Sequence, residues 1–117
     1  MADSGGAKET WSDPELVLGV RRGDRECFDV LVHRHQREVR AVARSICSDS
    51  EESQDVAQEA FLRAWTNLDL LVDPSRFGAW VRRIALACAI DGLRRRLPIP
   101  RAEIQASNNQ LIQNTGY

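Results

Sequence analysis

The segment from Asp55 to Arg96 constrains the fold of this chain more than any other part of the sequence. Apolar residues recur in it at steps of three and four, the spacing that places them on one face of an α-helix. One helix is expected to carry the stripe Val56, Ala57, Ala60, Phe61, Ala64, Trp65 and Leu68. A loop follows from Leu70 to Asp73, and Asp73-Pro74 starts a second helix with the stripe Phe77, Trp80, Val81, Ile84, Cys88 and Leu93. Neither helix can bury its apolar face alone, so the sequence predicts a helical bundle.

The same periodicity extends into the N-terminal half of the chain. A helix is expected from about Arg25 to Ile46, with the apolar positions Phe28, Leu31, Val32, His35, Val39, Val42, Ala43 and Ile46. A short helix should precede it, with Asp13 as its N-cap, Pro14 in its first turn and Gly23 after its end. Asp49 and Glu52 have the spacing of a capping box at the start of the next helix. Because no strand-like alternation occurs, the predicted fold class is all-α: a compact bundle of three long helices plus a short N-terminal helix.

Length and composition favour a single small domain. The chain has 117 residues, enough for one modest core. Residues 1–10 are small and polar and are expected to form a disordered tail, residues 11–97 the helical domain, and residues 98–117 a linker or tail. No apolar run reaches membrane-spanning length, and the N-terminus lacks a signal-peptide core. We therefore expect a cytoplasmic protein that does not contact the membrane.

Catalytic and metal-binding classes are disfavoured. The sequence contains no signature of a nucleotide-binding loop, a zinc protease or a serine hydrolase. Its three cysteines, Cys27, Cys47 and Cys88, are far apart and form no CxxC pair, so neither a zinc site nor a disulfide framework is expected. Cys27 and Cys88 are predicted to be small buried residues, and His35 a packed residue at the edge of the core. The chain is predicted to be no enzyme and to need no cofactor.

Charge is distributed unevenly along the chain. The formal net charge is −1, yet the first 60 residues carry an excess of acids and the remainder an excess of arginines. Asp55, Gln58, Glu59 and Leu62 share one side of their helix, away from the apolar stripe, where they form a surface suited to a basic partner. Arginines crowd the last helix and its start, at a density that can neutralise phosphates: Arg76, Arg82, Arg83, Arg94, Arg95 and Arg96. The pattern indicates one protein-binding surface and one nucleic-acid-binding surface.

The aromatic residues near this basic region have two possible roles. Trp65 and Phe77 lie on apolar stripes and are expected mainly in the core. Trp80 is as compatible with the core as with a surface on which an unpaired base can stack.

Two sequence blocks resemble region 2 of the sigma-70 family, and most closely that of the extracytoplasmic-function (ECF) sigma factors. They are DVAQEAFLRAW at residues 55–65 and FGAWVRRIA at residues 77–85, and AIDGLRR follows at residues 89–95. Shorter matches occur at residues 15–17, 23–24, 27–32 and 35–36. The blocks occur in the order and spacing of the family, and the resemblance covers residues 13–96.

The resemblance implies a role in transcription initiation. In this family the DxxQEAF helix docks on the clamp helices of the largest subunit of core RNA polymerase, which implies a polymerase-binding role for Asp55, Gln58, Glu59 and Arg63. The loop after that helix and the next helix open the promoter at its minus-ten element and hold a flipped base of the non-template single strand. The implied DNA-binding residues are Asn67, Leu68, Asp69, Leu71, Trp80, Arg82, Arg83, Ala87, Arg94, Arg95 and Arg96. Many relatives are also held inactive by an anti-sigma factor.

Three departures from the family pattern leave alternatives open. Leu71 stands where the family usually has an aromatic residue, and Ala87 where it often has asparagine. Nothing after Arg101 resembles region 4, the module that binds the minus-thirty-five element. One alternative is therefore a region-2-only regulator that docks on polymerase without selective promoter recognition. Another is a helical protein-interaction module with no link to polymerase.

Overall fold

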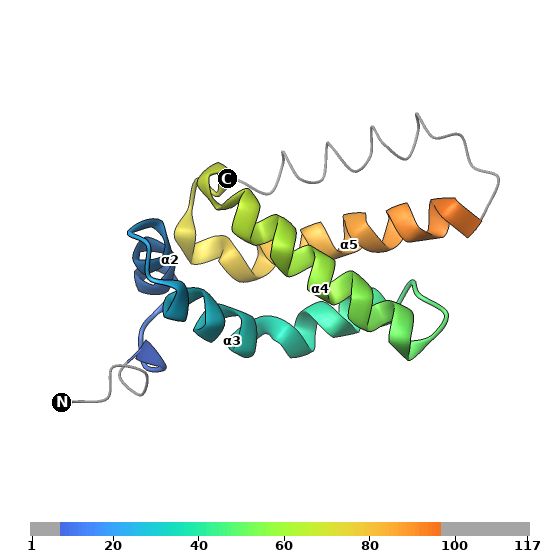
Figure 1. Cartoon of the computed structure of the whole chain (residues 1–117), viewed down its shortest axis with the longest axis horizontal. Helices are drawn as coiled ribbons and strands as arrows, with labels where there is room; N and C mark the ends of the chain where they lie inside the picture. Colours follow the sequence, from blue (N-terminus) through green and yellow to red (C-terminus); the bar gives the residue numbers. More distant parts are fainter. Residues whose placement is uncertain (1–7, 97–117) are drawn as a thin grey trace.

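The computed structural model describes residues 8–96 of the chain, without the side chain of Arg96. The elements are α2 (Asp13–Arg21), α3 (Arg25–Arg44), α4 (Ser50–Thr66), two short 3-10 helices η1 (Leu68–Leu70) and η2 (Pro74–Arg76), and α5 (Phe77–Arg96). In Figure 1, α4 crosses in front of α3 and α5, and α2 packs at the end where the two 3-10 helices lie. Residues 8–96 contain no strand, which confirms the predicted all-α bundle.

Two predicted features fall wholly or partly outside this range. Residues 1–7 of the expected tail and the expected linker at 98–117 lie outside the described residues. Within residues 8–96, no helix is both long enough and apolar enough to cross a membrane.

Ser12, and not Asp13 as predicted, caps the N-terminus of α2. The Ser12 hydroxyl accepts a hydrogen bond from the Glu15 backbone N–H, and the Glu15 carboxylate accepts one from the Ser12 backbone N–H at 2.8 Å. This reciprocal pair is a capping box. The Asp13 side chain is thereby released for contacts with α3, where it accepts hydrogen bonds from Arg34 at 2.8 Å and pairs with His35 Nε2 at 2.8 Å.

The corner between α2 and α3 is fixed by Gly23, Asp24 and Lys8. Gly23 has φ +100°, a conformation that side chains disfavour, and Asp24 then caps α3 by accepting from the Glu26 N–H. The Lys8 ammonium is buried against this corner, 2.7 Å from the Asp24 carboxylate and 2.6 Å from that of Glu26. Residues 8–10, predicted to belong to the disordered tail, are therefore part of the folded domain.

The core is built from α5 packed against α4, α3 and α2. Phe77, Trp80 and Ile84 of α5 are among the most completely buried side chains, together with Leu16 and Leu31. Cys27 and Cys88 are buried and unpaired, as predicted. The structure therefore confirms Phe77 as a core residue and resolves the two possible roles of Trp80 in favour of the core.

Trp65 does not lie in the core, contrary to the prediction. Its side chain is 41% exposed and meets the Phe28 ring edge-on at 5.0 Å, with the Arg25 guanidinium over its face. The inward position on that turn is taken by Ala64, and consecutive helical residues differ in direction by about 100°. Ala64 is therefore a core residue of α4, whereas its neighbour Trp65 lies at the surface.

Two glycines allow close helix–helix contact. A Cβ at Gly19 of α2 would collide with the Cys27 sulfur of α3, and one at Gly78 of α5 would lie 2.8 Å from Cε1 of His35. The His35 ring has little freedom to move aside, because it is nearly buried and held by Asp13. The short distances between α2 and α3 and between α5 and α3 therefore require glycine at positions 19 and 78.

We expect Gly78→Ala and Gly92→Ala to change stability in opposite directions, although both lie in α5. The new methyl group at position 78 meets the held His35 ring and should lower the free energy of unfolding by about 1–3 kcal/mol. At position 92 the nearest atom is 3.8 Å away, so the better helix propensity of alanine should raise it by up to about 1 kcal/mol. Urea unfolding followed by circular dichroism measures both, and stabilisation by Gly78→Ala would contradict the close packing.

Lys8→Met should alter the titration of Asp24. The hydrogen bond from Lys8 holds the pKa of Asp24 below its ordinary value of 3.8, so this pair stabilises the fold above that value and ceases to do so as the pH falls through the lowered pKa. Without Lys8, the Asp24 pKa should rise and acid unfolding should begin at higher pH. Carboxyl-detected NMR titration checks this, with the exposed Glu9→Gln as the control that leaves Asp24 unchanged.

Candidate protein- and nucleic-acid-binding surfaces

The outward side of α4 carries a surface that we call the α4 crest, defined as Asp55, Gln58, Glu59 and Leu62. All four side chains are exposed, as expected for residues opposite the apolar stripe. Glu59 accepts a hydrogen bond from Arg63 Nε at 3.1 Å, whereas Asp55 has no ion pair with any of the described residues. Leu62 is 59% exposed at the end of the crest that lies nearest to Trp65. The crest therefore combines a free carboxylate with a large apolar side chain in contact with water.

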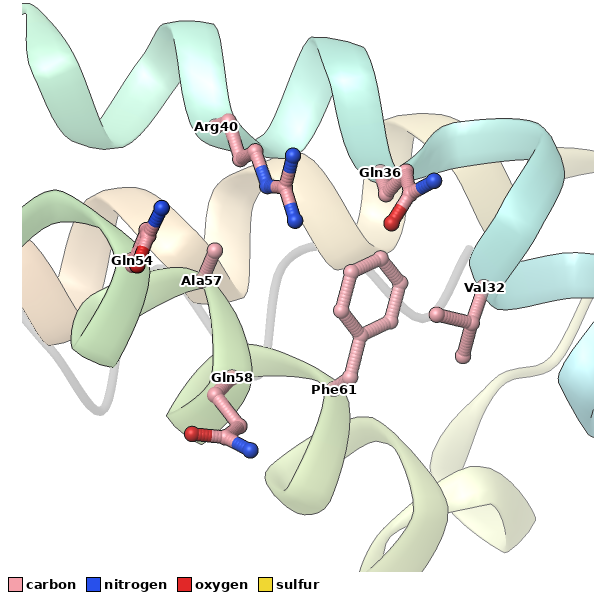
Figure 2. A pocket seen from close by; sticks show the side chains of 7 residues that line it. All are labelled: Val32, Gln36, Arg40, Gln54, Ala57, Gln58 and Phe61. Atoms are coloured by element: carbon pink, nitrogen blue, oxygen red, sulfur yellow. The ribbon is translucent and has the colours of Figure 1, made fainter.

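A groove borders the crest on the side of α3. It encloses about 350 Å³, and its floor is formed by Phe61 and Ala57. Figure 2 shows Arg40 reaching from α3 over the groove toward α4, with Gln36 beside it and Gln58 on the opposite rim. Gln58 and Phe61 also line a second hollow, which continues along the seam to Phe28, Leu62 and Trp65. The seam thus changes from polar at one end to apolar at the other.

A separate hollow borders the crest on the other side, between α4 and α5. Four acidic and two basic residues line it: Glu52, Asp55, Glu59, Asp91, Arg63 and Arg95. Cys88 lies at its base, where burial raises the pKa of the thiol to about 11. The thiol therefore stays protonated at neutral pH and is a poor nucleophile or metal ligand. Within residues 8–96, no three His, Cys, Asp or Glu side chains lie so that they could hold a metal ion together.

The segment that joins α4 to α5 is held by hydrogen bonds to its backbone. One guanidinium nitrogen of Arg21, from α2, donates to the carbonyl oxygens of Leu68 at 3.1 Å and Leu71 at 2.6 Å. The Asn67 side chain donates to the Arg63 carbonyl at 2.9 Å. At the far end, the Asp73 carboxylate accepts from the Ser75 hydroxyl and backbone N–H, which lowers the pKa of Asp73. The loop is consequently a fixed structure before any ligand binds.

Within this loop, exposure and burial alternate. Leu68 and Leu71, both implied DNA contacts, are buried, whereas Asp69 is exposed. Leu70 and Val72 are 56% and 67% exposed. Leu71, at the position that is usually aromatic in the family, therefore points into the core, and its neighbours present the apolar surface. The sequence patterns did not single out Leu70, Val72 or Arg21, since the loop has no helical period and Arg21 lies 47 residues from Leu68.

Trp80 and Ala87 are also fully buried, although both were implied to contact DNA. The Trp80 ring packs 6.1 Å from that of Phe77, and neither side chain has accessible surface. A stacking face at Trp80 and a base contact at Ala87 are therefore incompatible with this conformation. The reason is the central position of α5, whose faces are covered by α3, α4 and the loop. Trp80 and Ala87 therefore belong to the core beneath the proposed DNA-binding surface and are not part of that surface.

The basic residues of α5 fall into two separate groups. Arg83 is exposed without an ion pair among the described residues, and Arg82 lies 3.4 Å from Glu38 of α3. Twelve residues further along, or about 18 Å of helix, Arg94 and Arg95 both face Asp91, at 3.1 and 3.6 Å. Arg95 also lines the hollow beside the α4 crest. The side chain of Arg96 lies outside the described part of the chain.

Comparison with known proteins identifies the family. The model for sigma-70 region 2 matches residues 31–97. The RNA polymerase sigma-H factor of Pseudomonas aeruginosa is 36% identical over 103 residues, which cover 86% of this chain and 53% of that protein. The ECF RNA polymerase sigma factor SigM of Mycobacterium tuberculosis is 32% identical over 86% of this chain and 51% of its own length.

A third relative extends the same pattern. The ECF RNA polymerase sigma-E factor of Escherichia coli is 39% identical over 82 residues, or 69% of this chain and 42% of that protein. The chain spans about half the length of the curated relatives it matches. No solved structure matches it. The region-2 match over more than half of the chain, on an all-helical bundle, shows that this chain belongs to the sigma-70 family, within its ECF group.

Proposed function

We propose that the chain binds core RNA polymerase through the α4 crest and contributes to promoter opening at the minus-ten element. The observation that carries this proposal is the exposure of Asp55, Gln58 and Glu59 beside the exposed Leu62, on the helix with the DVAQEAF block of the family. Action beside polymerase would take place in the cytoplasm. The clamp helices of the largest polymerase subunit are the proposed docking partner.

The physical character of the α4 crest supports protein docking. Binding energy at protein interfaces is concentrated in a few central, desolvated side chains surrounded by polar groups that exclude water. Leu62, which lines the same apolar hollow as Phe28 and Trp65, supplies the apolar part of such an interface, and Asp55 and Glu59 fit the polar rim opposite a basic helix. An anti-sigma factor that covered Leu62 would compete with polymerase for the same surface.

The loop supports the DNA side of the proposal. Extruding a base from a duplex costs a few kcal/mol, which apolar contacts and phosphate-binding groups can offset. Leu70 and Val72 provide the apolar contacts on a loop that Arg21 holds rigid, with Asp69 beside them. Arg83, and Arg82 once it leaves Glu38, are placed to contact the phosphates. We expect DNA binding by this chain alone to be weak, salt-sensitive and stronger for single strands than for duplex.

A second candidate is the regulator that docks on polymerase without selective promoter recognition. The burial of Leu71 and Ala87 favours it, because neither family position offers a group to a base. Transcription in vitro, with region 4 supplied, separates these two candidates, since only the first starts at a defined promoter. Binding to purified core polymerase separates both from a helical module with no link to transcription.

We expect Asp55→Arg, Glu59→Arg and Leu62→Ser each to weaken binding to core polymerase by about tenfold or more. Charge reversal would oppose a basic partner, and serine would remove the apolar side chain of the crest. Biolayer interferometry with immobilised core polymerase measures the affinities. Leu18→Ser on α2 is the matched control, because it removes another exposed leucine far from the crest. Wild-type affinity in all three crest variants, with unchanged helical circular dichroism, would rule out α4 docking.

The double substitution Leu70→Ser, Val72→Ser should impair DNA binding alone. We expect the affinity for a minus-ten-like non-template strand to fall by about tenfold, since contacts worth about 1–2 kcal/mol would be lost. Binding to core polymerase should remain at the wild-type level, whereas Leu62→Ser should show the reverse pattern. Fluorescence anisotropy with the labelled strand tests this. Equal loss of both activities in the loop variant would contradict the assignment of two separate surfaces.

A further inference from the structure

Helix α3 carries an arginine stripe that no role above has used. We define the α3 stripe as Arg37, Arg40 and Arg44, whose spacing of three and four places them on one side of the helix. All three are exposed, and none forms an ion pair or hydrogen bond with another described residue. Arg40 projects over the groove between α3 and α4 (Figure 2). The stripe therefore presents three uncompensated positive charges to solvent.

The stripe differs in this respect from the described arginines of α5 other than Arg83. Arg82 lies beside Glu38, and Arg94 and Arg95 lie beside Asp91, so carboxylates offset much of their charge. Glu38 is adjacent to Arg37 in sequence, yet its carboxylate lies 3.4 Å from Arg82 and 3.6 Å from His35. It is thus directed toward α5 and away from the stripe. Within residues 8–96, the least compensated row of arginines lies on α3.

The composition of the stripe favours nucleic acid over protein as its ligand. The centres of protein interfaces are rich in aromatic and other large apolar side chains. The large apolar residues that are exposed in this structure are Leu18, Leu62, Trp65, Leu70 and Val72, and none of them lies on α3. Arginines on a helix without large exposed apolar residues suit phosphates, which they bind through paired N–H groups.

The spacing of the stripe also suits a phosphate backbone. Arg37 and Arg44 are seven residues apart, or about 10 Å along the helix axis. In duplex DNA, successive phosphates of one strand advance by about 3.4 Å along the axis, so that length spans about three of them. We propose that the α3 stripe is a second DNA-binding surface, which holds the sugar-phosphate backbone without base specificity and is separate from the α4–α5 loop.

The test compares the salt dependence of DNA binding between the whole wild-type chain and the variant R37Q/R40Q/R44Q. Glutamine removes the charges while keeping a polar side chain of good helix propensity. The probes are a labelled oligothymidine strand and a labelled duplex, measured by fluorescence anisotropy over a salt series. Each lost phosphate contact should reduce the slope of log affinity against log salt by about 0.7 for the single strand and about 0.9 for the duplex. We expect a slope shallower by about two units on at least one probe, and an affinity at low salt lower by about tenfold or more.

Two further variants serve as controls, one that keeps the charges of the stripe and one that removes a charge elsewhere on the surface. R37K/R40K/R44K keeps the charges and should retain most of the wild-type slope. R22Q removes one exposed arginine at the end of α2. It should leave the slope unchanged and alter the affinity by no more than about twofold. If R22Q lowers the slope by as much as one third of the reduction in R37Q/R40Q/R44Q, net charge alone explains the result and the proposal is overturned.

Binding to core polymerase is measured in parallel on the same variants. Retained polymerase affinity with a reduced salt slope supports the proposal, whether or not the α4 crest proves to be the docking surface. An unchanged slope on both probes overturns it. Loss of polymerase affinity with unchanged DNA binding also overturns it, because the stripe would then contact an acidic protein surface.

Discussion

The hydrogen bonds from Arg21 to the carbonyl oxygens of Leu68 and Leu71 fix the part of the structure on which both proposed functions depend. Within the 3-10 turn the Leu68 carbonyl accepts a hydrogen bond from the Leu71 N–H, and further donors to this segment must come from other elements. Here one side chain of α2 supplies them, and Leu68 and Leu71 can then direct their side chains into the core. The direction in which α5 leaves α4, and hence the position of the loop relative to the α4 crest, follows from this contact.

Arg63 connects the crest to the loop at the level of single atoms. Its side chain donates to Glu59 on the crest, and its carbonyl oxygen accepts from the Asn67 side chain at the start of the loop. A partner that drew Glu59 away would leave the Arg63 guanidinium free beside Asp91 and Arg95, in the hollow between α4 and α5. The proposed docking and DNA-binding surfaces thus occupy neighbouring parts of one short segment.

The sequence predicted the helices well because burial in a bundle imposes a period of 3.6 residues, and α3, α4 and α5 keep it over many turns. It failed where one residue decides between two neighbours. The predicted apolar stripe placed both Ala64 and Trp65 inward, yet of the two only Ala64 is buried. Asp13 was predicted as the N-cap of α2, although Glu15, three residues after Ser12, indicates that Ser12 is the cap. The pairing of Arg82 with Glu38 joins residues 44 apart and leaves no local pattern. Charge counts along the chain therefore located basic residues without showing which of them are free.

The enclosure of α5 affects how genetic data on this chain should be interpreted. A helix that is buried along most of its length, with only a few exposed arginines proposed to contact DNA, will lose function through misfolding at more positions than through lost contacts. In a random mutagenesis screen, inactive alleles at Trp80, Ile84 or Ala87 would cluster beside Arg83 in the sequence and resemble a DNA-binding footprint. Measuring the cellular abundance of each mutant protein would distinguish the helix as a scaffold from the exposed residues as the contact surface.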